Sequence, residues 1–265
     1  MNVTFPSPMN LCNLAPWEIA SAEFNEDPKS IHICGVRESN QSFFAQLDAT
    51  EDENRRGEIF HEYMSVKFGL HLWPDYQANA RRCLRNSYIR FLRGWGIDSN
   101  SIEGAVIKGW AQSRFGIHPS FHKQKLTALM TVERGAFAYD LMRGKSHTNV
   151  IDSQFDLLYE YCQYECARRH PGETHVTLFR GTHDPDEYYQ IEVRGKREKC
   201  IRLNNISSFT SDSEKAWEFG STAWKSSVPF AKVFFYSKLL PDSLLKGEDE
   251  YLVIGGDFWV KELLF

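Results

Sequence analysis

Hydrophobic residues in the first half of the chain recur at helical spacing. Within residues 76–96 and 123–145 they fall three, four or seven positions apart, at Ala80, Leu84, Tyr88, Phe91, Leu126, Met130, Phe137 and Leu141. This repeat predicts two amphipathic helices. Gly96 and Gly144 stand where these helices would end, because glycine often follows the last turn of a helix.

The second half opens with one more helical pattern, at about 152–169, and then changes to strand patterns. Short apolar or alternating segments bounded by turn formers predict strands. They are "HVTLFRG", "YYQIEV", "KCIRLNNIS", "FAKVFFYS", "EYLVIGG" and "FWVKELLF". One helix is expected among them, at "SDSEKAWEFG", where Ser211 and Glu214 have the spacing of a capping box.

Together these patterns predict an α+β fold. Strands that follow one another with few helices between them favour antiparallel sheets, on which the helical half would pack. The pattern of the chain changes, from mainly helical to mainly strand-like, around "RGKSHTNVIDS", residues 143–153, a polar stretch with turn formers. We therefore expect a mainly helical N-terminal region over 1–150 and a strand-rich core over 151–265, within one compact unit.

The composition excludes some classes of protein. The 265 residues have a formal net charge of -4, with 42% hydrophobic and 25% charged residues, as in ordinary globular proteins. This balance gives no reason to expect nucleic-acid binding. The chain has no apolar run of about 18 residues, so no membrane span is predicted. The N-terminus lacks the pattern of a secretory signal, and we expect a cytoplasmic protein.

The cysteines indicate packing and not metal binding. Six are scattered without a Cys-x-x-Cys pair, which predicts mainly buried free thiols in a reducing compartment. Cys162, Cys166 and His170 share one face of the helix expected over 152–169. The sequence shows no further ligands that would complete a metal site with them. Both cysteines also continue an apolar stripe along the helix. We predict core packing for this cluster and no metal.

The helix expected over 76–93 is basic, since it carries Arg81, Arg82, Arg85, Arg90 and Arg93. We interpret these arginines as a solvated face whose aliphatic stems cover the core. Docking on an acidic protein partner is the alternative.

Three acids stand before the apolar run in "GEDEYLVIGG". In a strand, residues two apart point to the same face, so Glu248 and Glu250 would project together and Asp249 would point away. Two neighbouring carboxylates perturb each other's pKa, which suits acid–base work and the stabilisation of a cationic transition state. The alternative is a solubilising strand edge.

Arg180 ends the apolar strand of "TLFRGTHD" and is followed by Gly181. The planar guanidinium matches phosphate in bidentate geometry, and glycine lets a ligand come close to the backbone. The alternative is an arginine paired with a surface carboxylate.

Hydroxyl residues end another predicted strand, in "ISSFTSDSEKAWEFG". Helix N-capping would account for Ser211 but not for Ser208. A hydroxyl at a strand end can hydrogen-bond both a sugar and a nearby carboxylate.

An Arg-Gly strand, a serine strand and a Glu-x-Glu strand, in this order, resemble the arginine–serine–glutamate class of mono-ADP-ribosyltransferases. Over almost the whole chain, the segments "NLCNLAPWEIASAEFNEDP", "HICGVRESNQSFFAQLD" and "SFHKQKLTALMTVERGAFAYDLMRGKSHTNVIDSQFDLLYEYCQ" resemble the dinitrogenase reductase ADP-ribosyltransferase family. The resemblance implies transfer of ADP-ribose from NAD to an arginine of the nitrogenase iron protein, which inactivates it. It also implies regulation through a PII-type signalling protein. The core over 151–265 would then be two small, mostly antiparallel sheets around an NAD cleft.

The same resemblance implies a role for each residue. Glu250 would stabilise the positive charge that develops on the ribose as nicotinamide leaves, as in glycoside hydrolysis. Glu248 would hold and help deprotonate the acceptor arginine, whose guanidinium is otherwise protonated. Arg180 would bind the pyrophosphate or adjoining ribose, Gly181 would offer its backbone, and Ser208 would hydrogen-bond Glu250. The loop 238–247 would recognise the target protein.

The chain departs from the class in its serine motif, where Ser208-Phe209-Thr210 replaces Ser-Thr-Ser. We expect Phe209 to pack in the core. An aromatic residue after this motif would stack on nicotinamide, for which Phe219 is the candidate and Trp217 the rival.

Other functions stay open on the sequence. No Gly-x-Gly-x-x-Gly is present, which disfavours a hydride-transferring dinucleotide fold and fits NAD as a consumed substrate. The alternatives are an NAD glycohydrolase, a transferase with another acceptor, and a non-catalytic NAD-binding regulatory module.

Overall fold

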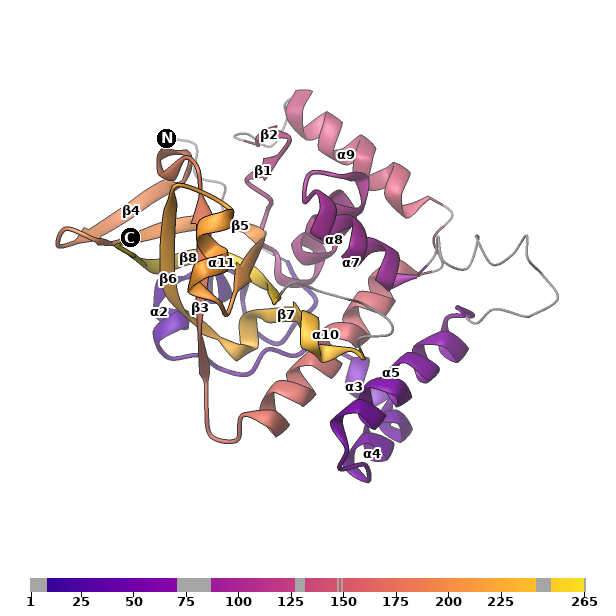
Figure 1. Ribbon diagram of the computed structural model, residues 1–265. Coiled ribbons are helices and arrows are strands. Elements are labelled where there is room, and N and C mark those ends of the chain that lie inside the picture. The colour runs from indigo at the N-terminus through magenta and orange to yellow at the C-terminus, as the bar shows by residue number, and fades with distance from the viewer. Residues whose placement is uncertain are drawn as a thin grey trace.

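The computed structural model describes residues 9–70, 87–126, 132–146, 148, 150–241 and 249–264. Strands gather on one side of the molecule, and α10 (Ile151–Arg169) runs between them and the helices of the other side (Figure 1). The remaining helices in the described residues are α1 (Pro16–Ala20), α2 (Ala22–Glu26), α3 (Val36–Ser39), α4 (Gln41–Asp48), α5 (Glu53–Lys67), α7 (Tyr88–Ile97), α8 (Ile102–Phe115), α9 (Val132–Lys145) and α11 (Ser213–Glu218).

Six strands form one hydrogen-bonded network in which every pairing is antiparallel. They are β3 (His175–Thr182), β4 (Tyr189–Arg194), β5 (Glu198–Thr210), β6 (Thr222–Pro229), β7 (Val233–Tyr236) and β8 (Glu250–Glu262). The expected α+β class is confirmed. The network closes on itself, because β5 pairs with β3 and β8, and β6 pairs with the same two strands. A separate short ladder joins β1 (Phe121–His122) to β2 (Gln124–Lys125).

Two long strands hold this network together. β8 spans both of the strands expected near the C-terminus, and β5 extends beyond its predicted segment. A bulge lies between Leu203 and Ile206 of β5, opposite Gly255 and Gly256. A Cβ on Gly255 would lie 1.7 Å from the Asn204 carbonyl oxygen, and Gly256 has φ +118°. These glycines let β8 bend and continue where the sequence predicted a break.

The sequence analysis missed β6, which pairs with β3 along its whole length. Its polar centre, Lys225-Ser226-Ser227, hides the alternation of a strand. The structure also corrects the cap of α11. The side chain of Asp212 accepts a hydrogen bond from the Glu214 N–H at 2.9 Å, so Asp212 and not Ser211 is the N-cap.

The expected helices are found with changed bounds. α9 is described from Val132, and β2 occupies the start of the segment predicted as one helix over 123–145. α7 ends at Ile97, one residue after Gly96. Residues 76–86 of the predicted basic helix, including Arg81, Arg82 and Arg85, lie outside the described residues. Arg90 pairs with Glu103 at 2.6 Å, at the surface of the helical region.

The hydrophobic core is shared by both halves of the chain. One cluster of buried side chains includes residues from α4, α5, α7, α8 and α10 and from the sheet. In this cluster the rings of Trp110, Phe155 and Phe234 pack on one another, with centroids 4.4–5.7 Å apart. Cys162 and Cys166 are buried in this cluster, as predicted. The predicted boundary near residue 150 stays a prediction.

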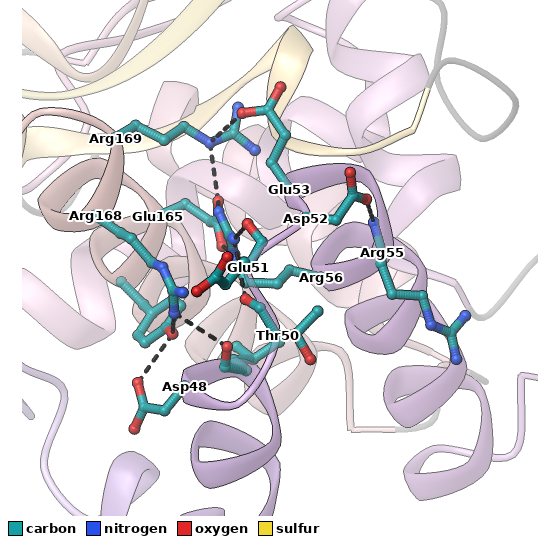
Figure 2. Close-up of polar contacts among 12 residues, drawn as sticks. Asp48, Thr50, Glu51, Asp52, Glu53, Arg55, Arg56, Glu165, Arg168 and Arg169 are labelled. Carbon is teal, nitrogen blue, oxygen red and sulfur yellow. Dashed lines mark hydrogen bonds and ion pairs between the residues drawn. The ribbon is translucent and has the colours of Figure 1, made fainter.

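A row of buried carboxylates on α10 binds the N-terminal region. Asp156 accepts hydrogen bonds from Trp110 and Arg114 of α8, and Glu160 accepts them from the Ile33 N–H and Arg37. Glu165 forms a two-point ion pair with Arg56 of α5, at 2.6 and 2.9 Å, and also binds Arg169 (Figure 2). These contacts join α10 to segments up to 127 positions away in the chain.

In the part of the chain that the structure describes, no helix is long and apolar enough to cross a membrane. The cysteines described there are free, with Cys34 exposed and the others buried.

Candidate functional site

Arg180 lies near the end of β3 and points toward the ends of neighbouring strands. Its Nη1 donates to the Ser208 carbonyl oxygen at 2.5 Å, and its Nη2 donates to the Tyr188 hydroxyl at 3.0 Å. No described carboxylate lies within 4.0 Å of its guanidinium, so the alternative of a surface ion pair is wrong. Arg180 is therefore oriented by neutral groups, and its positive charge remains available for an anion.

Gly181 makes room for α11. A Cβ at this position would lie 1.9 Å from the Ala216 carbonyl oxygen and 3.1 Å from the Phe219 carbonyl carbon. Gly220 similarly lies against β3, since a Cβ on Gly220 would be 2.1 Å from the carbonyl carbon of Thr182. The absence of side chains here brings α11 against the strand that carries Arg180.

Ser208 lies on β5 and is contacted from the helical region. The indole Nε1–H of Trp95, on α7, donates to the Ser208 Oγ at 2.9 Å. Trp95 is buried and Ser208 is half-buried. A residue 113 positions earlier in the chain thus orients the hydroxyl that the sequence singled out.

Glu250 is the first residue of β8. Its N–H donates to the Ser237 Oγ at 2.8 Å, and that hydroxyl donates to the Glu250 carbonyl oxygen at 3.2 Å. Gly96 of α7 lies beside the carboxylate, since a Cβ on Gly96 would be 3.7 Å from the Glu250 Oε2. The last turn of α7 therefore contacts both Ser208 and Glu250.

The register of β5 and β8 brings the predicted residues onto one face. Thr210 is paired with Glu250, and Ser208 with Leu252. Paired residues in an antiparallel ladder project to the same side, so Ser208 and Glu250 are diagonal neighbours. The hydrogen bond expected between their side chains stays a prediction.

The strand alternation predicted for the acidic residues does not extend to Asp249. Asp249 has φ +48°, a left-handed conformation, and β8 begins only at Glu250. Asp249 lies 3.3 Å from the Lys238 ammonium and 3.8 Å from that of Lys215. Glu248 and most of the loop 238–247 lie outside the described residues.

A pocket of about 590 Å³ opens beside Arg180 and Ser208. A volume of this size is typical of small-molecule sites. One wall comes from the helical region, with Trp95, Asn100 and Lys108, and the other from β5 and the segment that joins β3 to β4. Both halves of the chain therefore build it.

The aromatic residues predicted near nicotinamide differ in exposure. Phe219, at the end of α11, is 58% exposed, and its backbone lies against Gly181. Trp217 is half-buried. Phe209 is buried in the core, as predicted, with its ring centroid 6.0 Å from the Arg180 guanidinium carbon.

Sequence reasoning missed Trp95, Gly96, Lys108 and Tyr188. Trp95 and Lys108 fall at positions that a helical pattern assigns to the core, and only the fold shows that this part of the core borders a pocket. The segment "GWG" at 94–96 was the one available signal, because glycines beside a tryptophan permit close approach to another element.

Comparisons with known proteins show the family of the chain. The sequence model described as "Dinitrogenase reductase ADP-ribosyltransferase (DRAT)" matches residues 9–262. The chain belongs to the dinitrogenase reductase ADP-ribosyltransferase family. It is also 43% identical, over 259 residues, to the NAD(+)--dinitrogen-reductase ADP-D-ribosyltransferase of Rhodospirillum rubrum, covering 95% of this chain and 93% of that protein. No solved structure matches the chain.

In this member of the dinitrogenase reductase ADP-ribosyltransferase family, the matched region includes every element that builds the pocket. Among the described residues, no group of three or more His, Cys, Asp or Glu side chains is placed to hold a metal ion.

Proposed function

We propose that the chain transfers ADP-ribose from NAD to dinitrogenase reductase, the nitrogenase iron protein, and releases nicotinamide. The observation that carries this proposal is a pocket lined by Arg180 of β3 and Ser208 of β5, with Glu250 of the paired strand β8 as the diagonal neighbour of Ser208. Membership of the family supports the choice of NAD and of this target.

In the proposed reaction the bond between ribose C1′ and the nicotinamide nitrogen breaks, and a bond from C1′ to an acceptor nitrogen forms. Positive charge develops on the ribose as nicotinamide leaves with the electron pair. Glu250 stabilises that charge. Arg180 binds the pyrophosphate or adjoining ribose, Gly181 contributes its backbone, and Ser208 holds the nicotinamide ribose. Phe219 stacks on nicotinamide.

The proposed acceptor is an arginine side chain of the target. Its guanidinium is protonated in water and is a poor nucleophile, so it must lose a proton as the new bond forms. We assign that role to Glu248. The resemblance to arginine-modifying transferases supports this assignment, and so does the sequence of the Glu-x-Glu motif.

We further propose regulation by a PII-type signalling protein and a cytoplasmic location. The family resemblance alone supports the regulator. The location is supported by the described cysteines, which are free thiols as expected in a reducing compartment.

The test is incubation with labelled NAD and purified iron protein. Label on an arginine of the iron protein is expected, together with release of nicotinamide. Glu250→Gln should lower both transfer and NAD hydrolysis by about 10²-fold or more, because a neutral amide cannot stabilise the developing charge. Glu248→Gln should reduce transfer more than hydrolysis.

Glu262→Gln is the matched control, since Glu262 is exposed at the far end of the same strand, β8. Full activity of the Glu250 variant would contradict the assigned role. Release of free ADP-ribose with no labelled protein would indicate a glycohydrolase instead. Tight NAD binding without nicotinamide release would indicate a non-catalytic module.

A further inference from the structure

Lys108 is a buried lysine in the wall of the pocket. It lies on α8 with 1% of its surface exposed. Its ammonium donates to the Asn100 Oδ1 at 3.3 Å and lies 5.7 Å from the ring centroid of Trp95. The backbone is fixed as well, because the Asn205 amide of β5 donates to the Lys108 carbonyl oxygen at 2.7 Å.

The positive charge of Lys108 lacks a close counterion. Among the described residues, no carboxylate lies within 4.0 Å of its ammonium. Burial lowers the pKa of Lys108 to about 7, against a smaller raising effect of Asp98. Burying an ammonium is costly unless an opposite charge compensates it, so this position is suited to an anionic ligand.

A short chain of contacts connects Lys108 to the candidate active site. Lys108 lies near the Trp95 ring, and Trp95 donates to the Ser208 hydroxyl. The carbonyl oxygen of the same serine accepts from Arg180. Arg202, another cation of the pocket, is already paired with both oxygens of Asp257, at 2.6 and 2.8 Å. Lys125, the remaining cation of the pocket, is exposed. Lys108 and Arg180 are thus the buried and half-buried cations of the pocket that have no carboxylate partner among the residues described.

We propose that Lys108 binds the diphosphate of NAD together with Arg180, so that the helical region supplies one of the two cations of that subsite. This inference rests on the proposed function. The choice of the diphosphate follows from charge, since the two phosphates are the anionic groups of NAD. Nicotinamide, adenine and the riboses offer no negative charge to a buried ammonium.

Titration calorimetry of NAD and of ADP-ribose against Lys108→Met tests the proposal. Methionine has a similar length and keeps the apolar stem. Loss of a charged hydrogen bond should weaken both ligands by about tenfold or more. Lys232→Met is the matched control. Lys232 is also fully buried, and its pKa is also lowered to about 7 by burial, but it donates to the Gly255 carbonyl away from the pocket.

A proton count provides a second readout. An anion beside Lys108 raises its pKa, so binding should draw a proton from buffer at about pH 8, where the free lysine is mostly neutral. Calorimetry in two buffers of different ionisation enthalpy measures this uptake, which Lys108→Met should abolish.

Other charged groups also surround Lys108 and the pocket. They are Asp98 on the turn after α7, His122 on β1, Lys125 on β2, Arg180 on β3, Arg202 on β5, and Asp186 and Glu187 before β4. Burial lowers the pKa of His122, so it stays neutral at this pH.

The outcomes separate this inference from the proposed function. If wild-type protein binds neither NAD nor ADP-ribose, the proposed function fails. If it binds both, and Lys108→Met binds them with unchanged affinity and unchanged proton uptake, only the Lys108 assignment is overturned. Weakened NAD binding with unchanged ADP-ribose binding would place Lys108 near nicotinamide, which also overturns the diphosphate assignment.

Discussion

At the scale of single residues, the hydrogen bond from Trp95 to Ser208 is the most informative contact. An indole offers one donor and no acceptor, so Trp95 occupies one lone pair of the Ser208 hydroxyl oxygen. The hydroxyl proton of Ser208 stays free to turn toward a carboxylate or a sugar. The burial of Trp95 fixes the direction of its hydrogen bond. Trp95 is therefore a positioning residue for the hydroxyl that faces the proposed ribose site.

We predict that Trp95→Phe lowers the turnover number for nicotinamide release by about fivefold to tenfold, the worth of one buried hydrogen bond. Phenylalanine keeps an aromatic ring in the core, so the Michaelis constant for NAD should change little, whereas the cavity left by the smaller ring should lower the unfolding temperature. Steady-state kinetics and a thermal melt measure the three quantities. Trp17→Phe is the control, because Trp17 is 65% exposed on α1. A turnover number equal to that of the wild type would show that Ser208 needs no help from Trp95.

At the scale of elements, the packing of α11 on β3 decides where the end of the helix lies. Gly181 and Gly220 remove side chains from both sides of this contact. Asp212 caps the helix, and the Asp212 N–H donates to the Thr210 hydroxyl at 3.1 Å, so α11 begins directly where β5 ends. This arrangement holds Phe219 beside the strand that carries Arg180.

Gly181→Ala should therefore destabilise the fold. The added Cβ would lie 1.9 Å from the Ala216 carbonyl oxygen, and α11 must move to relieve the overlap. We expect a loss of about 1–3 kcal/mol in the free energy of unfolding, measured by urea titration. Gly135→Ala in α9 is the control, since nothing lies within 4 Å of its added Cβ, and it should stabilise by up to about 1 kcal/mol. Equal stability of Gly181→Ala and wild type would argue against tight packing of α11.

At the scale of the whole molecule, α10 joins the helical region to the sheet. One side of this helix packs on β7 and the core, while Asp156, Glu160 and Glu165 bind α8, the segment before α3, and α5. A site built from α7 and α8 on one side and from β5 and β8 on the other depends on this attachment. The two predicted regions are thus expected to unfold together.

We predict that Glu165→Met costs about 3–5 kcal/mol, because it leaves Arg56 buried without its counterion. Urea unfolding followed by fluorescence should show one transition at lower denaturant. Arg56→Met combined with Glu165→Met should recover much of the loss, since no buried charge then remains unpaired. Glu58→Gln is the control, because the Arg55–Glu58 pair is exposed to solvent and contributes little to stability. A small effect of Glu165→Met, similar to that of the control, would contradict the attachment role.

Local patterns were sufficient for much of the fold. The helical repeat of 152–169 and the alternation before Arg180 correspond to α10 and β3 almost without change. The pattern failed where long-range pairing outweighs local preference. β6 has a polar centre and is held as a strand by β3, and β8 continues through Gly255 and Gly256 because β5 bulges opposite them.

For the site, the sequence by itself determined the order of the Arg180, Ser208 and Glu250 motifs, since each lies at a strand end that can be recognised from its neighbours. Tertiary structure alone decided what surrounds them. Trp95 meets Ser208 across 113 positions, Gly96 lies beside Glu250, and Lys108 borders the pocket because Asn205 ties α8 to β5. No periodicity encodes such contacts, because they depend on how α7 and α8 pack on the sheet and not on the residues next to them in the chain.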